Sequence, residues 1–350
     1  MNESKRLSRL IAVGLDHSLA IKNGCLYSWG GNARWQLGVG SSRKDKHLPV
    51  RVGRFSDWEM VSSKGDSSFA IRRGRLYAWG ENDHGQLGLG DTLDRDMPCL
   101  VGSRTNWTTI SAGKSHTLGI AGGKLFAWGN NLSRQLGLPT HGAVKSPSQV
   151  GEDTHWTDVS AGEDHSLGIC GGRLFGWGSN RKSRLGLGSG GRNTVCSPTQ
   201  LDENSGWTYI SAGWESSFAI KEGQLFAWGS NYFGELGLGD TSERKKPVRV
   251  GNRFDWETVS TSLKSTFALA NGCVFCFGQL PGGEILGIQT SPKKVDDSFE
   301  WGGMVAGDSH ILAIRNDEVV SYGKNNFGQL GLGDTLSRLS FSPIYFSEQP

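Results

Sequence analysis

The sequence predicts an all-β fold, a seven-bladed β-propeller in which each blade is a four-stranded antiparallel sheet. Three observations support this prediction: one motif recurs seven times, glycine turns separate short strand patterns, and helical periodicity is absent. The first copy of the motif reads LYSWGGNARWQLGVG. Its aromatic marker falls at Trp29, Trp79, Trp128, Trp177, Trp228, Phe277 and Tyr322, with spacings of 50, 49, 49, 51, 49 and 45 residues. Such a regular period is typical of repeat architectures.

Each repeat contains four short strand patterns. In the fourth repeat the first three strand patterns are residues 159–161, 166–169 and 174–177. The fourth pattern is a proline-led segment, which is present in most repeats. Turns such as Asn23-Gly24 join the second and third patterns, and glycine supplies the positive φ angles that tight hairpins need. The seventh repeat uses Asn316-Asp317 instead. One such sheet cannot bury both of its faces, whereas seven sheets stacked around an axis can.

The whole chain, residues 1–350, is therefore expected to form one domain. Its blades are expected near residues 10–52, 58–101, 107–150, 156–201, 207–250, 256–295 and 301–346. The sixth repeat departs most from the others, with TSLKS at 261–265 and FGQLP at 277–281. This departure reflects either neutral drift or a shape imposed by a partner.

Composition excludes several classes of protein. The 37 Lys and Arg residues against 34 Asp and Glu leave a net charge of +3, so nucleic-acid binding is not expected. No apolar run approaches the roughly 18–20 residues of a membrane span. The N-terminus lacks the apolar core of a secretory signal, and the six cysteines are scattered. These features predict an intracellular protein and favour the cytoplasm over the nucleus.

Strand parity places the loops after the first and third strands of every blade on the same face, with the former nearer the axis. The two variable positions of these inner loops carry six acidic residues and two lysines. Because one sign of charge in a cleft focuses the electric field, we expect this acidic inner ring to bind a partner. Its candidate residues are Asp16, Asp66, Glu163, Asp164, His165, Trp214, Glu215, Asp308 and His310.

Four histidines occupy the next position of these loops, and serine occupies it in the other three. A metal or acid–base site is one interpretation; hydrogen bonding inside the blades is the other. The alternation with serine and the absence of local metal-ligand spacing favour the structural interpretation. The sequence contains no phosphate-binding loop or nucleophile elbow, so no catalytic residue, metal or cofactor is expected. Cys273 and Cys276 have the spacing of a redox or zinc pair, but they belong to one strand, where residues i and i+3 point to opposite faces. We therefore expect both cysteines to be structural.

The outer loops of the same face are rich in arginine and aromatic residues, which are enriched in protein interfaces. The candidate partner-binding residues of this outer rim are Arg34, Trp35, Arg134, Arg184, Tyr232 and Phe233. Trp35, Arg134 and Ser183 stand where other repeats have glycine. A solvated charged rim is the alternative interpretation. The opposite face carries basic hairpins, which either meet an acidic partner or keep the strand edges soluble.

The run Trp-Gly-x-Asn-x-x-Gly-Gln-Leu-Gly, together with Ser-Ala-Gly-x-x-His-Ser/Thr, resembles the regulator of chromosome condensation repeat. The resemblance extends from about Leu10 to Phe346 in seven copies and implies the same seven-bladed fold. Relatives include a guanine-nucleotide exchange factor for the GTPase Ran, bacterial effectors, a plant ultraviolet-B photoreceptor, a secreted β-lactamase inhibitor and binding modules of larger assemblies. By this resemblance, the candidate exchange residues are Asp16, Asp66, Asp164, His165, Asp308 and His310.

Departures from these relatives narrow the function. The photoreceptor's tryptophan cluster is reduced here to Trp214, and the repeat spacing leaves no room for the exchange factor's extra hairpin wedge. The sequence therefore favours a non-enzymatic protein-interaction module whose partner is a protein, either a small GTPase or a larger assembly. The alternative is a guanine-nucleotide exchange factor for a Ras-like or Ran-like GTPase. An enzyme with its own chemistry ranks third.

Overall fold

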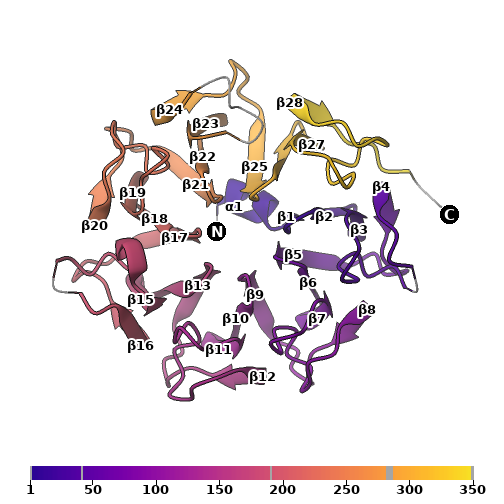
Figure 1. The fold of residues 1–350 in the computed structure, drawn as a ribbon, viewed down its shortest axis with the longest axis horizontal. Helices are drawn as coiled ribbons and strands as arrows, with labels where there is room; N and C mark the ends of the chain where they lie inside the picture. Colours follow the sequence, from indigo (N-terminus) through magenta and orange to yellow (C-terminus); the bar gives the residue numbers. More distant parts are fainter. Residues whose placement is uncertain (1, 41, 190, 281–286, 348–350) are drawn as a thin grey trace.

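Seven four-stranded antiparallel sheets are arranged around a central axis in the computed structural model (Figure 1). The structure describes residues 2–40, 42–189, 191–280 and 287–347. In every sheet the strands follow one another in chain order, so within these ranges no blade combines the two ends of the chain. The predicted fold is confirmed. Part of the divergent 277–281 segment of the sixth repeat lies outside the described residues.

The strands follow the predicted periodicity closely. They are β1 (Ile11–Val13), β2 (His17–Lys22), β3 (Cys25–Gly30), β4 (Lys46–Arg51), β5 (Trp58–Lys64), β6 (Ser67–Arg72), β7 (Arg75–Gly80), β8 (Arg95–Leu100), β9 (Trp107–Ala112), β10 (His116–Ala121), β11 (Lys124–Gly129), β12 (Val144–Gln149), β13 (Trp156–Ala161), β14 (His165–Cys170), β15 (Arg173–Ser179), β16 (Thr194–Gln200), β17 (Trp207–Ala212), β18 (Ser216–Lys221), β19 (Gln224–Gly229), β20 (Arg244–Arg249), β21 (Trp256–Thr261), β22 (Ser265–Ala270), β23 (Cys273–Gly278), β24 (Gln289–Lys294), β25 (Trp301–Ala306), β26 (His310–Arg315), β27 (Glu318–Gly323) and β28 (Arg338–Pro343). A short 3-10 turn, η1 (Arg181–Ser183), interrupts the loop of blade 4.

The repeated tryptophan of the third strand joins neighbouring blades. Trp29 of β3 is fully buried, and its Nε1 donates to the carbonyl of Gln329 in blade 7 at 2.9 Å. The hydroxyl of Ser18 donates to the same carbonyl at 2.8 Å. Blades 2 to 5 repeat this double bond to the blade before them. The repeated tryptophan thus fixes each of these blades to the one before it.

The loop after the third strand is held by its own side chains. Asn32 Oδ1 accepts from the Leu37 amide at 3.1 Å, and Gln36 Oε1 accepts from the Arg34 amide at 2.8 Å. Equivalent bonds recur around the ring. The asparagine and glutamine of the motif therefore satisfy backbone groups of their own loop.

The hairpin glycines are required by the linkers that connect successive blades. A Cβ atom on Gly24 would lie 2.2 Å from the carbonyl oxygen of Ser56, and one on Gly223 only 1.9 Å from that of Phe254. In blade 7 the hairpin residues Asn316 and Asp317 both have positive φ, at 53° and 60°. No linker crosses this hairpin in the described chain, so a side chain fits there.

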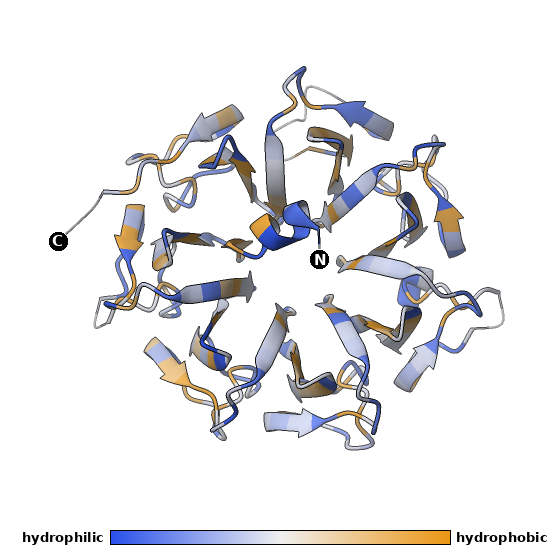
Figure 2. Cartoon of the chain, turned by 180° about the vertical axis from the view of Figure 1, so that it is seen from behind, coloured by the Kyte–Doolittle hydropathy of each residue, from blue (hydrophilic) through white to orange (hydrophobic). Residues whose placement is uncertain are grey.

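A short helix, α1 (Glu3–Ser8), precedes blade 1 and was not expected from the sequence. It lies over the centre of the ring (Figures 1 and 2). Lys5 Nζ donates to Asp158 Oδ2 of blade 4 at 2.7 Å and to the Thr208 carbonyl of blade 5 at 3.1 Å. Ser4 donates to Glu257 of blade 6. The helix thereby connects blades that are far apart in sequence. It is too short to span a membrane, and no other helix in the described ranges is long and apolar enough to do so.

Candidate functional site

The inner loops surround the mouth of the central channel. The channel mouth is a cavity of about 350 Å³ whose chemically distinctive lining residues are Lys64, Lys114, Glu163, Trp214 and Asp308. These five side chains come from blades 2, 3, 4, 5 and 7. Three of them, Glu163, Trp214 and Asp308, belong to the predicted acidic inner ring, and the structure brings these three to the axis.

Polar contacts fix the side chains of the channel mouth. Trp214 Nε1 donates to Asp308 Oδ2 at 2.8 Å, and the other oxygen of Asp308 accepts from the Leu263 amide at 3.0 Å. Lys114 Nζ lies 2.9 Å from Glu163 Oε1 and 4.7 Å from the centre of the Trp214 ring. The carboxylates are thus pre-oriented while both still line the cavity.

Lys64 is a functional candidate that sequence reasoning missed. It stands where five other repeats have the glycine of Ser-Ala-Gly, and its side chain enters the channel. Its Nζ donates to the carbonyls of Ala161 and Ala212 at 3.3 and 3.2 Å. Burial lowers the pKa of Lys64, whereas the charges of Asp308 and Glu163 oppose that shift. A lysine replacing a motif glycine was the available signal.

The other predicted acids lie between blades rather than at the axis. Asp66 Oδ1 accepts from Gln36 Nε2 of blade 1 at 2.9 Å, and Glu215 lies 3.4 Å from Arg184 of blade 4. Burial raises the pKa of Asp16, Asp66 and Asp164. We call Asp16, Asp66, Asp164 and Glu215 the between-blade carboxylates; they form a second, wider ring around the channel mouth.

His165 and His310 are fully buried and do not face a partner in this structure. The Nε2 atom of His165 is hydrogen-bonded to Ser217 of the next blade at 2.9 Å, and that of His310 to Ser18 at 2.7 Å. Burial lowers the pKa of His310 to about 3 and that of His165 well below its usual value, so both rings stay neutral. The histidines join blades, and no group of three metal-ligating residues occurs among the described residues.

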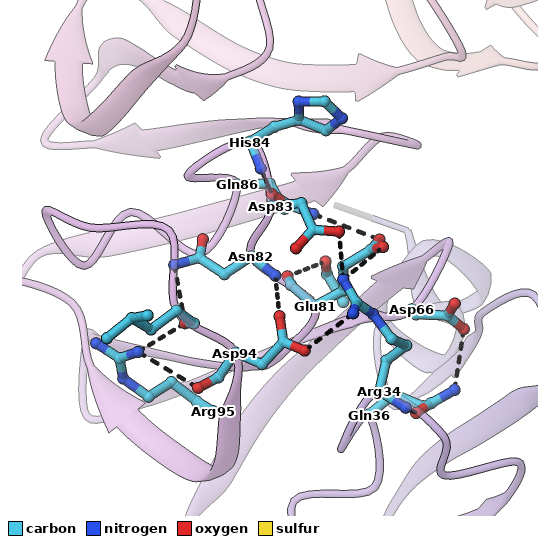
Figure 3. A network of polar contacts seen from close by, with 12 residues as sticks. Arg34, Gln36, Asp66, Glu81, Asn82, Asp83, His84, Gln86, Asp94 and Arg95 are labelled. Atoms are coloured by element: carbon cyan, nitrogen blue, oxygen red, sulfur yellow. Dashed lines mark hydrogen bonds and ion pairs between the residues drawn. The ribbon is translucent and has the colours of Figure 1, made fainter.

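Arg34 of the outer rim is engaged at the junction of blades 1 and 2 (Figure 3). Its guanidinium lies 3.2 Å from Glu81 and 3.4 Å from Asp94, and it also pairs with Asp83. Burial and the charge of nearby Asp66 raise the pKa of Glu81. The Arg34 side chain is one-third exposed, so it stabilises the junction and still borders the surface.

Two rim residues occupy backbone positions that favour glycine. Trp35 and Arg134 have φ angles of 62° and 63°. Backbone conformations of this kind cost of order 1 kcal/mol or more in non-glycine residues and concentrate at functional sites. The guanidinium of Arg43 lies 4.9 Å from the Trp35 ring centre, and Arg134 donates to the Pro139 carbonyl at 3.1 Å.

The remaining rim residues differ in exposure. Tyr232 is 60% exposed, and its hydroxyl accepts from Lys182 at 2.9 Å. Phe233 is half-buried, with Lys264 Nζ at 4.8 Å from its ring centre. Arg184 is buried, contrary to its expected place on the rim, because it occupies the position of the motif glutamine between two blades. Its backbone carbonyl accepts from Trp228 Nε1, as the glutamine carbonyl does in other repeats.

A family model describing the Regulator of chromosome condensation (RCC1) repeat matches residues 23–71, 73–120, 122–169, 171–220 and 222–269, more than half of the chain. The chain belongs to this family. Each match runs from the third strand of one blade into the second strand of the next, so the family's repeat is offset from the blade. The family model covers five repeats, and the structure contains seven blades.

Several solved structures have the same fold as this RCC1-repeat protein. Human WBSCR16 is 20% identical, with 92% of this chain and 95% of that chain covered and a TM-score of 0.81. Yeast RCC1 (Prp20) bound to Kap60 is 19% identical, with 99% and 87% covered and a TM-score of 0.78. Prp20p from Saccharomyces cerevisiae, described with its binding to Gsp1p and histones, is 19% identical, with 99% and 90% covered and a TM-score of 0.78.

One curated relative resembles a short stretch of this RCC1-repeat protein. It is Ras guanine nucleotide exchange factor C of Dictyostelium discoideum, 42% identical over 55 residues. The match covers 15% of this chain and 4% of that relative. It therefore spans a small fraction of the larger protein's length.

Proposed function

We propose that this RCC1-repeat propeller is a non-enzymatic protein-interaction module that binds a protein partner through the face bearing the channel mouth. The observation that carries the proposal is the pair Glu163 and Asp308, held by Lys114 and Trp214 at the rim of an open cavity. Fixed carboxylates lose little side-chain freedom when they accept a partner's hydrogen bonds.

The charge of this face selects a partner that presents basic side chains. The between-blade carboxylates surround the channel mouth, and half-burial strengthens their field because water screens it less. Exposed apolar side chains at the rim, Leu132 at 64% and Tyr232 at 60%, offer anchors at greater radius. The channel mouth itself holds two lysines and two carboxylates, so the complementary surface has basic side chains over the between-blade carboxylates and apolar contacts at the rim.

Capture of partners from the protein's own cell lysate tests this face. The variant Asp164→Lys/Glu215→Lys reverses two between-blade carboxylates, and we expect it to recover at least tenfold less partner than the unmodified protein. The matched control is Glu152→Lys/Glu203→Lys, which makes the same charge change at exposed linker positions of the opposite face. Equal loss in both variants, or no loss in the first, contradicts the proposal.

Guanine-nucleotide exchange on a small GTPase is the second candidate. It is favoured by family membership, by the described binding of Prp20p to Gsp1p, and by the short match to a Ras exchange factor. The same face would contact the GTPase, and no covalent chemistry would be needed. The proposal therefore extends from binding to nucleotide release without new residues.

A nucleotide-release assay separates the two candidates. Ras-like and Ran-like GTPases loaded with a fluorescent guanine nucleotide are mixed with excess unlabelled nucleotide and the propeller. An exchange factor accelerates release more than tenfold, and Asp164→Lys/Glu215→Lys removes that acceleration. If the propeller binds a GTPase but does not change its rate of nucleotide release, exchange on that GTPase is excluded and the interaction module remains the proposed function.

A further inference from the structure

Six of the seven blade junctions share one construction. A linker leaves the fourth strand of one blade, passes over that blade's hairpin and enters the next blade at a tryptophan. The tryptophan amide donates to the hairpin carbonyl, as in Trp58 to Gly24 and Trp256 to Gly223, both at 3.0 Å. Its ring packs on the third strand of the new blade; the ring centres of Trp58 and Tyr77 are 5.2 Å apart.

The junction between blades 7 and 1 lacks this linker in the described chain, because α1 leads into blade 1. The place of the tryptophan ring is taken by Phe346, whose ring centre lies 5.0 Å from that of Tyr27 and 6.0 Å from that of Trp29. The hairpin carbonyl of Asp317 accepts from Lys22 Nζ at 2.6 Å instead of from a tryptophan amide. Among the described residues the ring position is therefore filled, whereas no segment follows the path of the linker.

A cavity of about 590 Å³ lies at this junction. We call it the seam cavity; Lys22, Cys25, Tyr27, Arg51, Glu318 and Tyr345 are among its lining residues. Its two cations outnumber its single carboxylate. Tyr345 is 78% exposed, so an aromatic face borders the opening.

Two equivalents of Lys22 in other blades bind carboxylates of incoming linkers. Lys22 ends β2, as Arg72 ends β6 and Arg315 ends β26. Arg72 pairs with Asp57, the linker residue just before Trp58. Arg315 lies 3.7 Å from Asp296 of the linker that enters blade 7. At this register position, the cations of blades 2 and 7 thus pair with an acidic residue of the incoming linker, whereas Lys221 of blade 5 lies over the Trp207 ring, 5.9 Å from its centre.

We propose that the seam cavity binds an extended peptide segment of a partner protein that carries an aspartate or glutamate at the position of Asp57, laid along the path that linkers occupy elsewhere. A carboxylate of the segment pairs with Lys22, Arg51 adds a second positive charge, and the segment's chain runs past the Asn316-Asp317 hairpin. The cavity lies on the face opposite the channel mouth. This site is therefore independent of the function proposed above, and either can fail without the other.

The chain itself supplies the probe. A peptide with the sequence of residues 53–57, Gly-Arg-Phe-Ser-Asp, labelled with fluorescein at its N-terminus and amidated, is titrated with the full protein while anisotropy is recorded. We expect a dissociation constant of about 100 μM, typical of a weak short-peptide contact. Lys22→Ala is expected to weaken binding at least fivefold, Lys22→Arg to retain it, and Asp→Asn in the peptide to match Lys22→Ala.

Lys221→Ala is the matched control for the protein. Lys221 ends β18 at the same register position, but a covalent linker already occupies that junction. Its loss should leave peptide affinity unchanged. An equal loss in Lys221→Ala and Lys22→Ala contradicts the assignment to the seam cavity.

Thiol protection locates the bound peptide. Cys25 lines the cavity, whereas Cys196 is exposed elsewhere, so the two alkylation rates are compared in one sample by mass spectrometry. Saturating peptide should slow iodoacetamide modification of Cys25 severalfold and leave Cys196 unchanged. Absence of binding at 1 mM peptide (about ten times the expected constant), binding that survives Lys22→Ala, or equal protection by acetate alone overturns the proposal.

Discussion

A Cβ atom on Gly162 would lie 2.5 Å from the Cε1 atom of the His165 ring. The same crowding holds at Gly113, whose Cβ would lie 2.7 Å from the ring of His116. In blades 2 and 6 serine replaces the histidine, and there the glycine is replaced as well, by Lys64 and Ser262. Blade 5 keeps its glycine, Gly213, beside Ser216, so the histidine requires the glycine but the glycine does not require the histidine. The absence of the histidine in blade 2 is what leaves room for Lys64 at the glycine position.

A double-mutant cycle at Gly162 and His165 tests this coupling. Gly162→Ser alone should destabilise the fold by about 2 kcal/mol through overpacking. His165→Ser alone should cost about 1 kcal/mol for its lost hydrogen bond to Ser217. Because the double variant reproduces the Ser262–Ser265 arrangement of blade 6, its cost should be smaller than the sum. Urea unfolding measures the three values, and strict additivity would show that the two residues are not coupled.

The buried histidines predict loss of stability in mild acid. An unfolded histidine titrates near pH 6.5, whereas burial lowers the pKa of His17, His116 and His310 to about 3. Below pH 6.5 the unfolded chain therefore binds protons that the folded chain does not, so the free energy of unfolding falls as the pH decreases. We expect a loss of about 1 kcal/mol per buried histidine between pH 7 and 5.5.

His310→Ser provides the control for this pH dependence. It removes one buried imidazole while placing there the residue that blades 2, 5 and 6 already use. The variant should be less stable at pH 7.5 but lose about a quarter less stability on acidification than the unmodified protein. The same slope in both proteins would mean that other groups cause the acid response. Burial raises the pKa values of Asp16, Asp66 and Asp164, so these three carboxyl groups act in the opposite direction.

Lys5 should contribute more to stability than its neighbour Arg6. The ammonium of Lys5 is mostly buried against Asp158, with Tyr209 also nearby at 5.2 Å. Arg6 is exposed and pairs only with Glu3 of its own helix among the described residues. Lys5→Met leaves the buried Asp158 carboxylate with the Val159 amide but without a cation, so we expect a cost of about 2–3 kcal/mol, against less than about 0.5 kcal/mol for Arg6→Met. Thermal unfolding compares them; equal effects would show that α1 does not brace the ring.

Phe346 should stabilise the closure of the ring, whereas Tyr345 should not. The Phe346 ring packs edge-on against Tyr27, while the Tyr345 side chain is mostly exposed. Phe346→Ala is expected to lower the free energy of unfolding by about 2 kcal/mol, and Tyr345→Ala by less than about 0.5 kcal/mol. Indistinguishable unfolding midpoints would show that the ring closes without this aromatic contact.

Repetition determined how much of the fold could be predicted. Seven copies of one pattern identified the strands, the hairpins and the structural tryptophans, since each copy supports the others. The features that were missed occur once: α1, Phe346 in place of a tryptophan, and Lys64. A helix of six residues has too little periodicity to detect, although Asn2 does cap it by accepting from the Lys5 amide at 2.9 Å.

The sequence indicated that the inner loops gather around the axis, but not which of their side chains reach it. Strand parity indicates on which face a loop lies, but it does not determine how each side chain leaves that loop. Glu163 and Asp308 turn toward the axis, whereas Asp66 turns outward to Gln36 of the neighbouring blade. Arg184 shows the same limit, because a long side chain at the glutamine position is buried between blades.

The association rate of a captured partner tests the central claim that carboxylates around the channel mouth attract it. Stopped-flow mixing would compare the unmodified protein, Asp164→Lys/Glu215→Lys and the opposite-face control Glu152→Lys/Glu203→Lys. Each is measured at about 50 mM salt, where screening of charges is weak, and at about 500 mM salt, where it is strong. We predict that association at low salt slows roughly tenfold in the first variant, that the control is unaffected, and that high salt removes the difference. Equal rates for all three proteins at low salt would contradict the proposed face.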